Sequence, residues 1–170
     1  DINVTAPDLC LHLHVRPGEA VLSLDGSGGS LHRRGYRAAM GLAPLKENLA
    51  AGLIRLTGWD GSVPLVDPMC GSGTFLIEAA SIALQLAPGL GRSFLLEGWS
   101  DFNLALWNQE KLRAFRRECR EQPLSKIVGC DQDPDIINQA NFNINKAKLH
   151  QLVNIQPHHF RELDFEIWIF

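Results

Sequence analysis

The sequence predicts an α/β protein in which helices cover a doubly wound, mostly parallel sheet, with a β-hairpin in front of it. Short apolar segments of strand length alternate with longer segments whose apolar residues recur at helical spacing, a pattern typical of β-α-β units. A glycine-rich turn over residues 67–73 joins one such strand to an apolar helix. Two alternating segments, 9–15 and 20–25, flank a Pro-Gly turn and predict the hairpin.

The first part of the chain, residues 1–37, is predicted to be this hairpin followed by a lead-in segment. Leu9–Val15 alternates apolar and polar side chains strictly, as a strand with two different faces does. Arg16–Glu19 contains the turn residues, and Gly26–Ser30 is a loop rich in glycine and serine. Residues 38–170 are predicted to form part of one further domain.

The remaining elements alternate along the chain. Pro44 suits the first turn of a helix, where no N–H is needed, and Gly58 suits its end. Pro134 opens a later helix in the same way. The predicted helices span residues 44–57, 73–86, 104–121 and 134–148, and the predicted strands span 63–66, 127–130, 152–155 and 165–170.

Composition excludes several classes of protein. The chain has 170 residues, 45% hydrophobic and 21% charged, which is ordinary for a soluble globular domain. Its net charge of -3 means that any contact with nucleic acid must be local. Its four cysteines lack Cys-x-x-Cys spacing, which argues against a disulfide framework or zinc ribbon and favours a reducing cytoplasm. No apolar run approaches the roughly 18 residues of a membrane span, and no secretory signal pattern is present.

The segment Val63–Thr74 carries the most specific chemistry. A short apolar strand ends at Asp67, a turn containing Gly71 and Gly73 follows, and an apolar helix begins. The glycines let the backbone approach a ligand closely, and the first turn of the helix offers N–H groups that have no partner within the helix. The segment is not a phosphate-binding Walker loop, because no Lys follows Gly73, nor Gly-x-Gly-x-x-Gly, because residue 76 is Leu.

Several segments together resemble one family. Asp67–Thr74 resembles motif I of S-adenosylmethionine-dependent methyltransferases that modify an exocyclic amine of a nucleic-acid base. Ser30–Arg37 and Ala43–Ala50 are similar to the lead-in of the THUMP-associated RNA guanine methyltransferases, and Val128–Pro134 resembles their second-strand motif. The resemblance covers residues 7–154 and is closest to the large-subunit ribosomal RNA guanine-N2 methyltransferases.

This resemblance implies a Rossmann-like class I methyltransferase fold, S-adenosyl-L-methionine as cofactor and transfer of its methyl group to the N2 amine of a guanine in ribosomal RNA. It also implies that Asp131 holds the ribose hydroxyls. Asp133 is the alternative ligand, and it is equally suited to cap the helix that opens at Pro134. The implied cofactor-binding residues are Asp67, Pro68, Met69, Cys70, Gly71, Ser72, Gly73, Thr74, Asp131 and Gln132.

Basic residues in the lead-in segment are candidates for RNA contact. Arg33, Arg34 and Arg37 cluster around Tyr36, and arginines commonly contact phosphates. The alternative is a surface turn packed by Tyr36. A second basic face, more typical of a solvated helix, consists of Arg113, Arg116, Arg117 and Arg120.

Two further sets of polar residues are candidate ligands. His12 and His14 point the same way on a strand, but the sequence shows no third ligand beside them, and we expect no metal site there. The residue that contacts the adenine of the cofactor stays open; the candidates after the third core strand are Gln156, His158, His159, Glu162 and Asp164.

The family's catalytic Asn-Pro-Pro-Tyr sequence is absent from these residues, so we expect the cofactor-binding half of a methyltransferase with no assignable catalytic residue. Three functions remain: a ribosomal RNA guanine methyltransferase, a related transfer-RNA or DNA amine methyltransferase, and a non-catalytic binding module. We also expect self-association through an open sheet edge, formed by residues 165–170 or by the strand at 63–66.

Overall fold

The computed structural model describes residues 3, 5, 7–37, 45–118 and 125–162. Its central sheet contains three parallel strands in the order β3-β4-β5, namely β3 (Leu65–Asp67), β4 (Ile127–Asp131) and β5 (Val153–Pro157). The register aligns Leu65 with Ile127 and Ile127 with Val153. The parallel α/β class is therefore confirmed. The strand expected over 165–170 lies outside the described residues.

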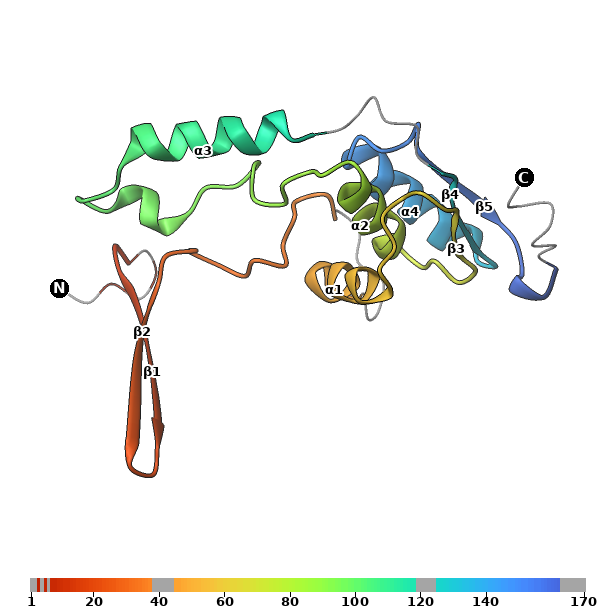
Figure 1. Ribbon diagram of the computed structural model, residues 1–170. Coiled ribbons are helices and arrows are strands. Elements are labelled where there is room, and N and C mark those ends of the chain that lie inside the picture. Colours follow the sequence, from red (N-terminus) through yellow and green to blue (C-terminus); the bar gives the residue numbers. More distant parts are fainter. Residues whose placement is uncertain (1–2, 4, 6, 38–44, 119–124, 163–170) are drawn as a thin grey trace.

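Three helices belong to the same part of the fold as the sheet: α1 (Glu47–Thr57), α2 (Thr74–Ala83) and α4 (Pro134–Lys146). Both crossovers run in the same direction across the sheet, which places α2 and α4 on the same face when both have the usual right hand, and α1 packs against α2 (Figure 1). The core between them is apolar and fully enclosed; its largest side chains are Leu76, Ile77, Leu84, Ile127, Ile144 and Leu149. The sequence placed these helices correctly to within a few residues, although position 44 lies outside the described part.

The predicted hairpin is confirmed. Strand β1 (Cys10–Arg16) pairs antiparallel with β2 (Glu19–Asp25), and Gly18 takes the positive φ that their tight turn requires. Figure 1 shows the hairpin extending away from the sheet and its helices. One face of it is apolar and remains exposed in the described structure; this face consists of Leu11, Leu13, Val15, Leu22 and Leu24.

The segment between α2 and β4 forms a separate group of elements beside the base of the hairpin (Figure 1). It contains the 3-10 helix η1 (Leu95–Gly98) and helix α3 (Leu104–Arg116). Trp107 holds the group together through edge contacts with the rings of Phe94 and Phe102, whose centroids lie 5.5 and 5.9 Å away. A second 3-10 helix, η2 (Phe160–Glu162), follows β5. The helix predicted over 104–121 ends earlier, at Arg116, and 119–121 lie outside the described residues.

Within the part of the chain that the structure describes, no helix is long and apolar enough to cross a membrane.

Candidate functional site

The carboxyl ends of the three parallel strands meet at one edge of the sheet, the usual ligand-binding edge of such folds. The loop after β3 contacts the end of β4, because the Gly71 N–H donates to Asp131 Oδ2 over 3.1 Å. The loop after β5 contacts the same residue, because the His158 N–H donates to the Asp131 carbonyl over 2.9 Å. Asp131 therefore connects the three loops of this edge.

The glycine-rich loop has the backbone shape that its glycines predict. Gly71 and Gly73 have φ of 52° and 80°, a region that side chains with a Cβ rarely adopt. A Cβ at Gly73 would lie 3.4 Å from Ala140 Cβ, so this position also keeps the loop close to α4. A Cβ at Gly71 would meet nothing within 4 Å, so this stretch of backbone is open to a ligand.

Within the described part of the chain, the first turn of α2 has none of the usual capping partners for its N–H groups. Gly73 is its N-cap residue, no side chain caps it, and no acidic residue lies in its first turn. Such a helix terminus attracts a carboxylate through its N–H groups and the helix dipole. Asn143 holds the loop residue Ser72, which precedes this helix terminus. Its fully buried side chain donates to the Ser72 carbonyl over 3.1 Å.

Two carboxylates lie at the ends of neighbouring strands. Asp67 Oδ1 accepts from the Met69 N–H at 3.2 Å, and Asp131 Oδ1 accepts from the Asp133 N–H at 3.1 Å. Burial raises the pKa of Asp67, and the nearby charge of Asp131 raises it further. Each Asp131 oxygen accepts one hydrogen bond from a backbone N–H and keeps a second lone pair. The carboxylate can therefore still accept hydrogen bonds from hydroxyl groups.

The alternative acid, Asp133, has a structural role. Its side chain caps α4 by accepting from the Asp135 N–H over 2.9 Å, as expected for a residue before Pro134. Asp131, and not Asp133, contacts the glycine-rich loop. Gln132, between them, is exposed.

The cysteines of the site have structural contacts. The Cys70 N–H donates to the Cys130 carbonyl over 2.8 Å, and Cys130 Sγ donates to the Pro68 carbonyl over 3.3 Å. Burial raises the pKa of both thiols. They are therefore neutral near pH 7 and lack the thiolate that a nucleophile needs.

The three arginines of the lead-in segment have different environments. Arg34 Nη2 lies 3.3 Å from Glu78 Oε2, and Arg37 donates to Thr74 Oγ1 over 2.8 Å. Both side chains are largely buried, whereas Arg33 is exposed. Arg37 therefore supports the first residue of α2, and Arg33 is the one of the three that faces solvent.

Two features of the site escaped sequence reasoning. Gly129 lies in the middle of β4, and a Cβ there would sit 2.3 Å from Leu76 Cδ1 and 3.1 Å from Cys70 Cβ. A glycine within a predicted strand indicates that another element packs closely against it, so the sequence could have predicted this contact. The second feature is Glu78, a lone acid in an apolar helix, which accepts from Tyr36 Oη at 3.0 Å. This buried contact joins the lead-in segment to α2.

The adenine-contacting residue stays undecided. Gln156 is exposed on β5, and His158 is half-buried where its loop meets Asp131. His159 stacks on Phe160 with ring centroids 4.8 Å apart. The side chain of Glu162 and all of Asp164 lie outside the described structure.

The parallel sheet, the open glycine-rich loop and the acid after the next strand define a Rossmann-like, nucleotide-binding class of protein. Within that class, residues 34–167 match the model of the RMKL-like methyltransferase domain, and the chain belongs to this family.

Relatives and solved structures agree with this assignment. The chain is 40% identical over 168 residues to the ribosomal RNA large subunit methyltransferase K/L of a Marinomonas species, and 41% identical over 157 residues to that of Vibrio campbellii. The matches cover 95% and 90% of this chain but only 23% and 22% of those proteins. The chain thus spans about a quarter of the length of these relatives.

Two solved structures share the fold over most of the chain. SMU.472, described as a methyltransferase and solved with S-adenosylhomocysteine, superposes with a TM-score of 0.86 at 33% identity, covering 92% of this chain and 40% of that one. A predicted N6-adenine-specific DNA methylase from Listeria monocytogenes gives 0.84 at 38% identity, covering 91% and 40%. The predicted Rossmann-like methyltransferase fold is confirmed.

Proposed function

We propose that this chain is the S-adenosylmethionine-binding part of an RNA methyltransferase. The observation that carries the proposal is the Gly71–Asp131 hydrogen bond, which places an acidic residue beside a glycine-rich loop that leads into an uncapped helix. An acid in this position serves to hold ribose hydroxyls in nucleotide-binding folds. The N-terminus of α2 suits the carboxylate of the cofactor's methionine part, and the open backbone at Gly71 leaves room for it.

The donor set also fits a cofactor that carries no phosphate. No lysine lies in the 67–74 loop, and the carboxylates of Asp67 and Asp131 lie beside it, while the Arg37 guanidinium is held against Thr74 and Glu47. A sulfonium cofactor is cationic at sulfur and its ammonium group, so nearby carboxylates favour it where they would repel a phosphate. When bound, it supplies an electrophilic methyl group; the residues of this chain bind and orient it, and we assign no catalytic residue.

The proposed substrate is the exocyclic N2 amine of a guanine in ribosomal RNA. The support is the motif resemblance together with the names of the relatives from Marinomonas and Vibrio. A transfer-RNA or DNA amine is the second candidate, because the Listeria protein carries the name of a DNA methylase. A non-catalytic binding module is the third. The free cysteines Cys10, Cys70 and Cys130 suit a cytoplasmic setting.

Calorimetry with S-adenosylhomocysteine tests the site. Asp131→Ala removes a charged acceptor and should weaken binding at least tenfold, since a hydrogen bond to a charged group is worth about 1.5–3 kcal/mol. Asp133→Ala is the matched control: it removes the α4 cap and should cost about 1 kcal/mol of stability while leaving affinity unchanged. Equal losses in both variants, or none in Asp131→Ala, would refute the assignment.

RNA contact is tested separately, by filter binding over a salt series. Arg33→Ala should weaken binding to a ribosomal RNA fragment and reduce the salt dependence by about one phosphate contact. Arg113→Ala on α3 is the control, because its exposed side chain already pairs with Glu110. Stronger binding to DNA of the same sequence would favour the second candidate, and absence of binding to either would favour the third.

A further inference from the structure

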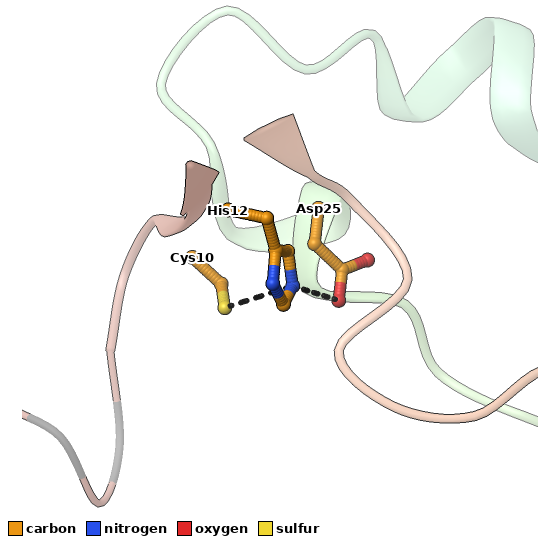
Figure 2. Close-up of side chains that lie close together, drawn as sticks. All are labelled: Cys10, His12 and Asp25. Atoms are coloured by element: carbon orange, nitrogen blue, oxygen red, sulfur yellow. Dashed lines mark hydrogen bonds and ion pairs between the residues drawn. The ribbon is translucent and has the colours of Figure 1, made fainter. Parts of the chain in front are cut away.

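The base of the hairpin brings together three different metal-binding side chains. Cys10 Sγ lies 3.8 Å from His12 Nε2, and Asp25 Oδ2 lies 3.8 Å from the same nitrogen. The three donor atoms all lie within 4.8 Å of one another. Figure 2 shows the imidazole between the thiol and the carboxylate. This cluster is remote from the glycine-rich loop and plays no part in the proposed cofactor site.

The hairpin register produces this arrangement. Cys10 and His12 are two residues apart on β1, so their side chains lie on the same face. Asp25 is the cross-strand partner of Cys10, which places its carboxylate on that face as well. The opposite face of the hairpin is the exposed apolar one. The expectation of no metal site beside His12 and His14 overlooked Cys10, two residues before His12 on the same strand, and could not include Asp25, which joins them only through the strand pairing.

The donors and their spacing suit zinc. In tetrahedral zinc sites, Zn–S of about 2.3 Å and Zn–N or Zn–O of about 2.0 Å place the ligand atoms about 3.3–3.6 Å apart. To reach this spacing, the two separations of 3.8 Å must shorten by a few tenths of an ångström, and the separation of Cys10 Sγ from the Asp25 carboxylate, which is within 4.8 Å, by at most about 1 Å. A thiolate with an imidazole selects zinc over magnesium or calcium, which prefer oxygen ligands. We infer that Cys10, His12 and Asp25 form a Zn²⁺ site that closes the base of the hairpin.

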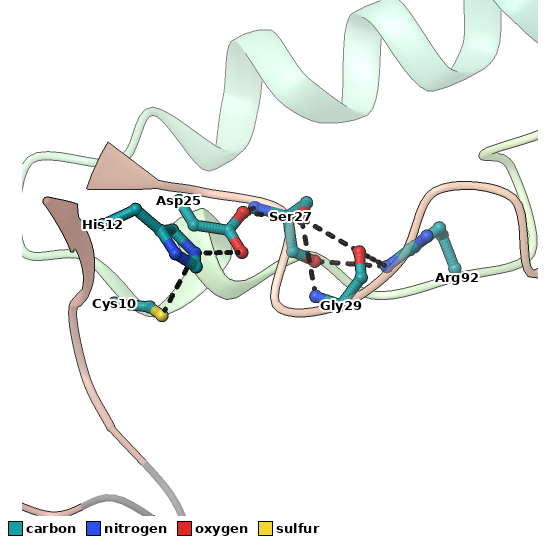
Figure 3. A network of polar contacts seen from close by, with 6 residues as sticks. All are labelled: Cys10, His12, Asp25, Ser27, Gly29 and Arg92. Atoms are coloured by element: carbon teal, nitrogen blue, oxygen red, sulfur yellow. Dashed lines mark hydrogen bonds and ion pairs between the residues drawn. The ribbon is translucent and has the colours of Figure 1, made fainter. Parts of the chain in front are cut away.

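Neighbouring groups hold the carboxylate in position. Ser27 donates to Asp25 Oδ1 from its N–H over 2.7 Å and from its hydroxyl over 2.6 Å, which leaves Oδ2 directed at His12. Arg92 Nη2 donates in turn to the Ser27 and Gly29 carbonyls over 3.2 and 3.3 Å (Figure 3). Such outer contacts orient metal ligands in known sites.

The expected coordination is three protein ligands and one water. His12 is 67% exposed and Asp25 27% exposed in their side chains, so the fourth position faces solvent. The ion would connect the first residue of β1 to the last residue of β2. It would therefore clamp the hairpin at its base to the loop that Arg92 anchors.

The test uses the full chain, freed of metal by a chelator and titrated with Zn²⁺ alone, then with Co²⁺ as a spectroscopic probe. We expect one ion per chain and a thiolate-to-cobalt charge-transfer band. Cys10→Ser should remove the band and weaken Zn²⁺ binding at least tenfold, and His12→Gln should weaken it similarly. The matched control is His14→Gln, on the same face, whose Nε2 accepts from Arg16 Nε over 2.9 Å and should not contribute.

Amide hydrogen exchange, compared with and without Zn²⁺ in the same chain, provides a readout in which a stability loss caused by the substitution itself cancels. Zn²⁺ should slow exchange across residues 10–25 in the wild-type chain and leave it unchanged in Cys10→Ser. No saturable Zn²⁺ binding, binding that survives both Cys10→Ser and His12→Gln, or an equal loss in His14→Gln would each overturn the inference.

Discussion

Gly129 shows how a single missing side chain determines the geometry of the site. Because its Cα faces Leu76 and Cys70, β4 can approach the start of α2 only without a Cβ. Gly129→Ala should therefore overpack this contact and lower the free energy of unfolding by about 1–3 kcal/mol. Urea denaturation measures this change.

Gly52, in α1, is the matched control for Gly129. A Cβ there meets nothing within 4 Å, so Gly52→Ala should stabilise the helix by about 0.5–1 kcal/mol. A neutral or stabilising Gly129→Ala would contradict the close approach of β4 and α2.

The contribution of Asp67 to the free energy of unfolding depends on pH. Because burial raises its folded-state pKa above the ordinary 3.8, the favourable contribution of its protonated form is lost as pH rises through the folded pKa. The stability of Asp67→Asn relative to the wild-type chain should therefore increase between about pH 4 and pH 7. Urea denaturation at several pH values checks this slope.

Asp60 supplies a control of opposite sign. Hydrogen bonds from Ser62 lower the pKa of Asp60, so its stabilising contribution is lost as pH falls through that lowered pKa. Asp60→Asn should lose relative stability as pH rises from the lowered pKa to about pH 4, whereas Asp67→Asn should gain relative stability above about pH 4. The same sign of slope for both variants would show that the environment assigned to Asp67 is wrong.

Single positions of the candidate site were predictable where their chemistry is local. Asp67, Gly71 and Gly73 follow from the strand-turn-helix pattern, because the turn needs positive φ and the strand end needs a polar residue. The burial of Arg34 and Arg37 was not predictable in this way. Their partners Glu78 and Glu47 belong to helices that only the folded chain brings beside them.

The contact between the lead-in segment and α2 depends on a buried ion pair. Burial raises the pKa of Glu78, and the charge of Arg34 opposes that rise. Glu78→Ala would leave the Arg34 guanidinium and the Tyr36 hydroxyl without their acceptor, which should cost about 3 kcal/mol of unfolding free energy. Thermal denaturation measures it.

A double-mutant cycle separates the Arg34–Glu78 pair from general packing. If the pair is coupled, Arg34→Ala combined with Glu78→Ala should cost clearly less than the sum of the single changes. Arg55→Ala, an exposed position on α1, should stay within about 0.5 kcal/mol of the wild-type chain. Additive single changes would indicate that the two charges do not interact in solution.

At the level of elements, hydrophobic periodicity predicted the type of every described helix and strand of the sheet domain. Periodicity identifies an apolar face but does not show which other element, if any, covers it. The alternation in 9–15 predicts a strand with one apolar face, but in the described structure that face has no cover. Helix α3 likewise has no buried residue; among the described residues it is attached through the aromatic cluster around Trp107 and the ion pair between Lys111 and Glu97.

For the whole molecule we predict concentration-dependent association. Leu13 and Leu22 are both 65% exposed and lie opposite each other on the apolar face of the hairpin. Burying a leucine fully is worth about 1.5–3 kcal/mol, so a few such side chains favour dimers at moderate concentration. Light scattering across a dilution series measures it.

Replacing both leucines identifies the surface. Leu13→Thr with Leu22→Thr should shift association to at least tenfold higher concentration, whereas His14→Thr on the other face should not. If the double change has no effect, the sheet edge at β3 is the remaining route, since β3 pairs only with β4 among the described strands. A clean monomer at high concentration would contradict both routes.

The length of the hairpin has a consequence for the position of its tip. Each strand is seven residues long, which at 3.3 Å per residue gives an arm of roughly 23 Å beyond its pivot at Asp25 and Ser27. A rotation of about 10° at its base would move the turn at Gly18 through about 4 Å. The position of the turn at Gly18 therefore depends strongly on how rigidly the base of the hairpin, at Asp25 and Ser27, is held.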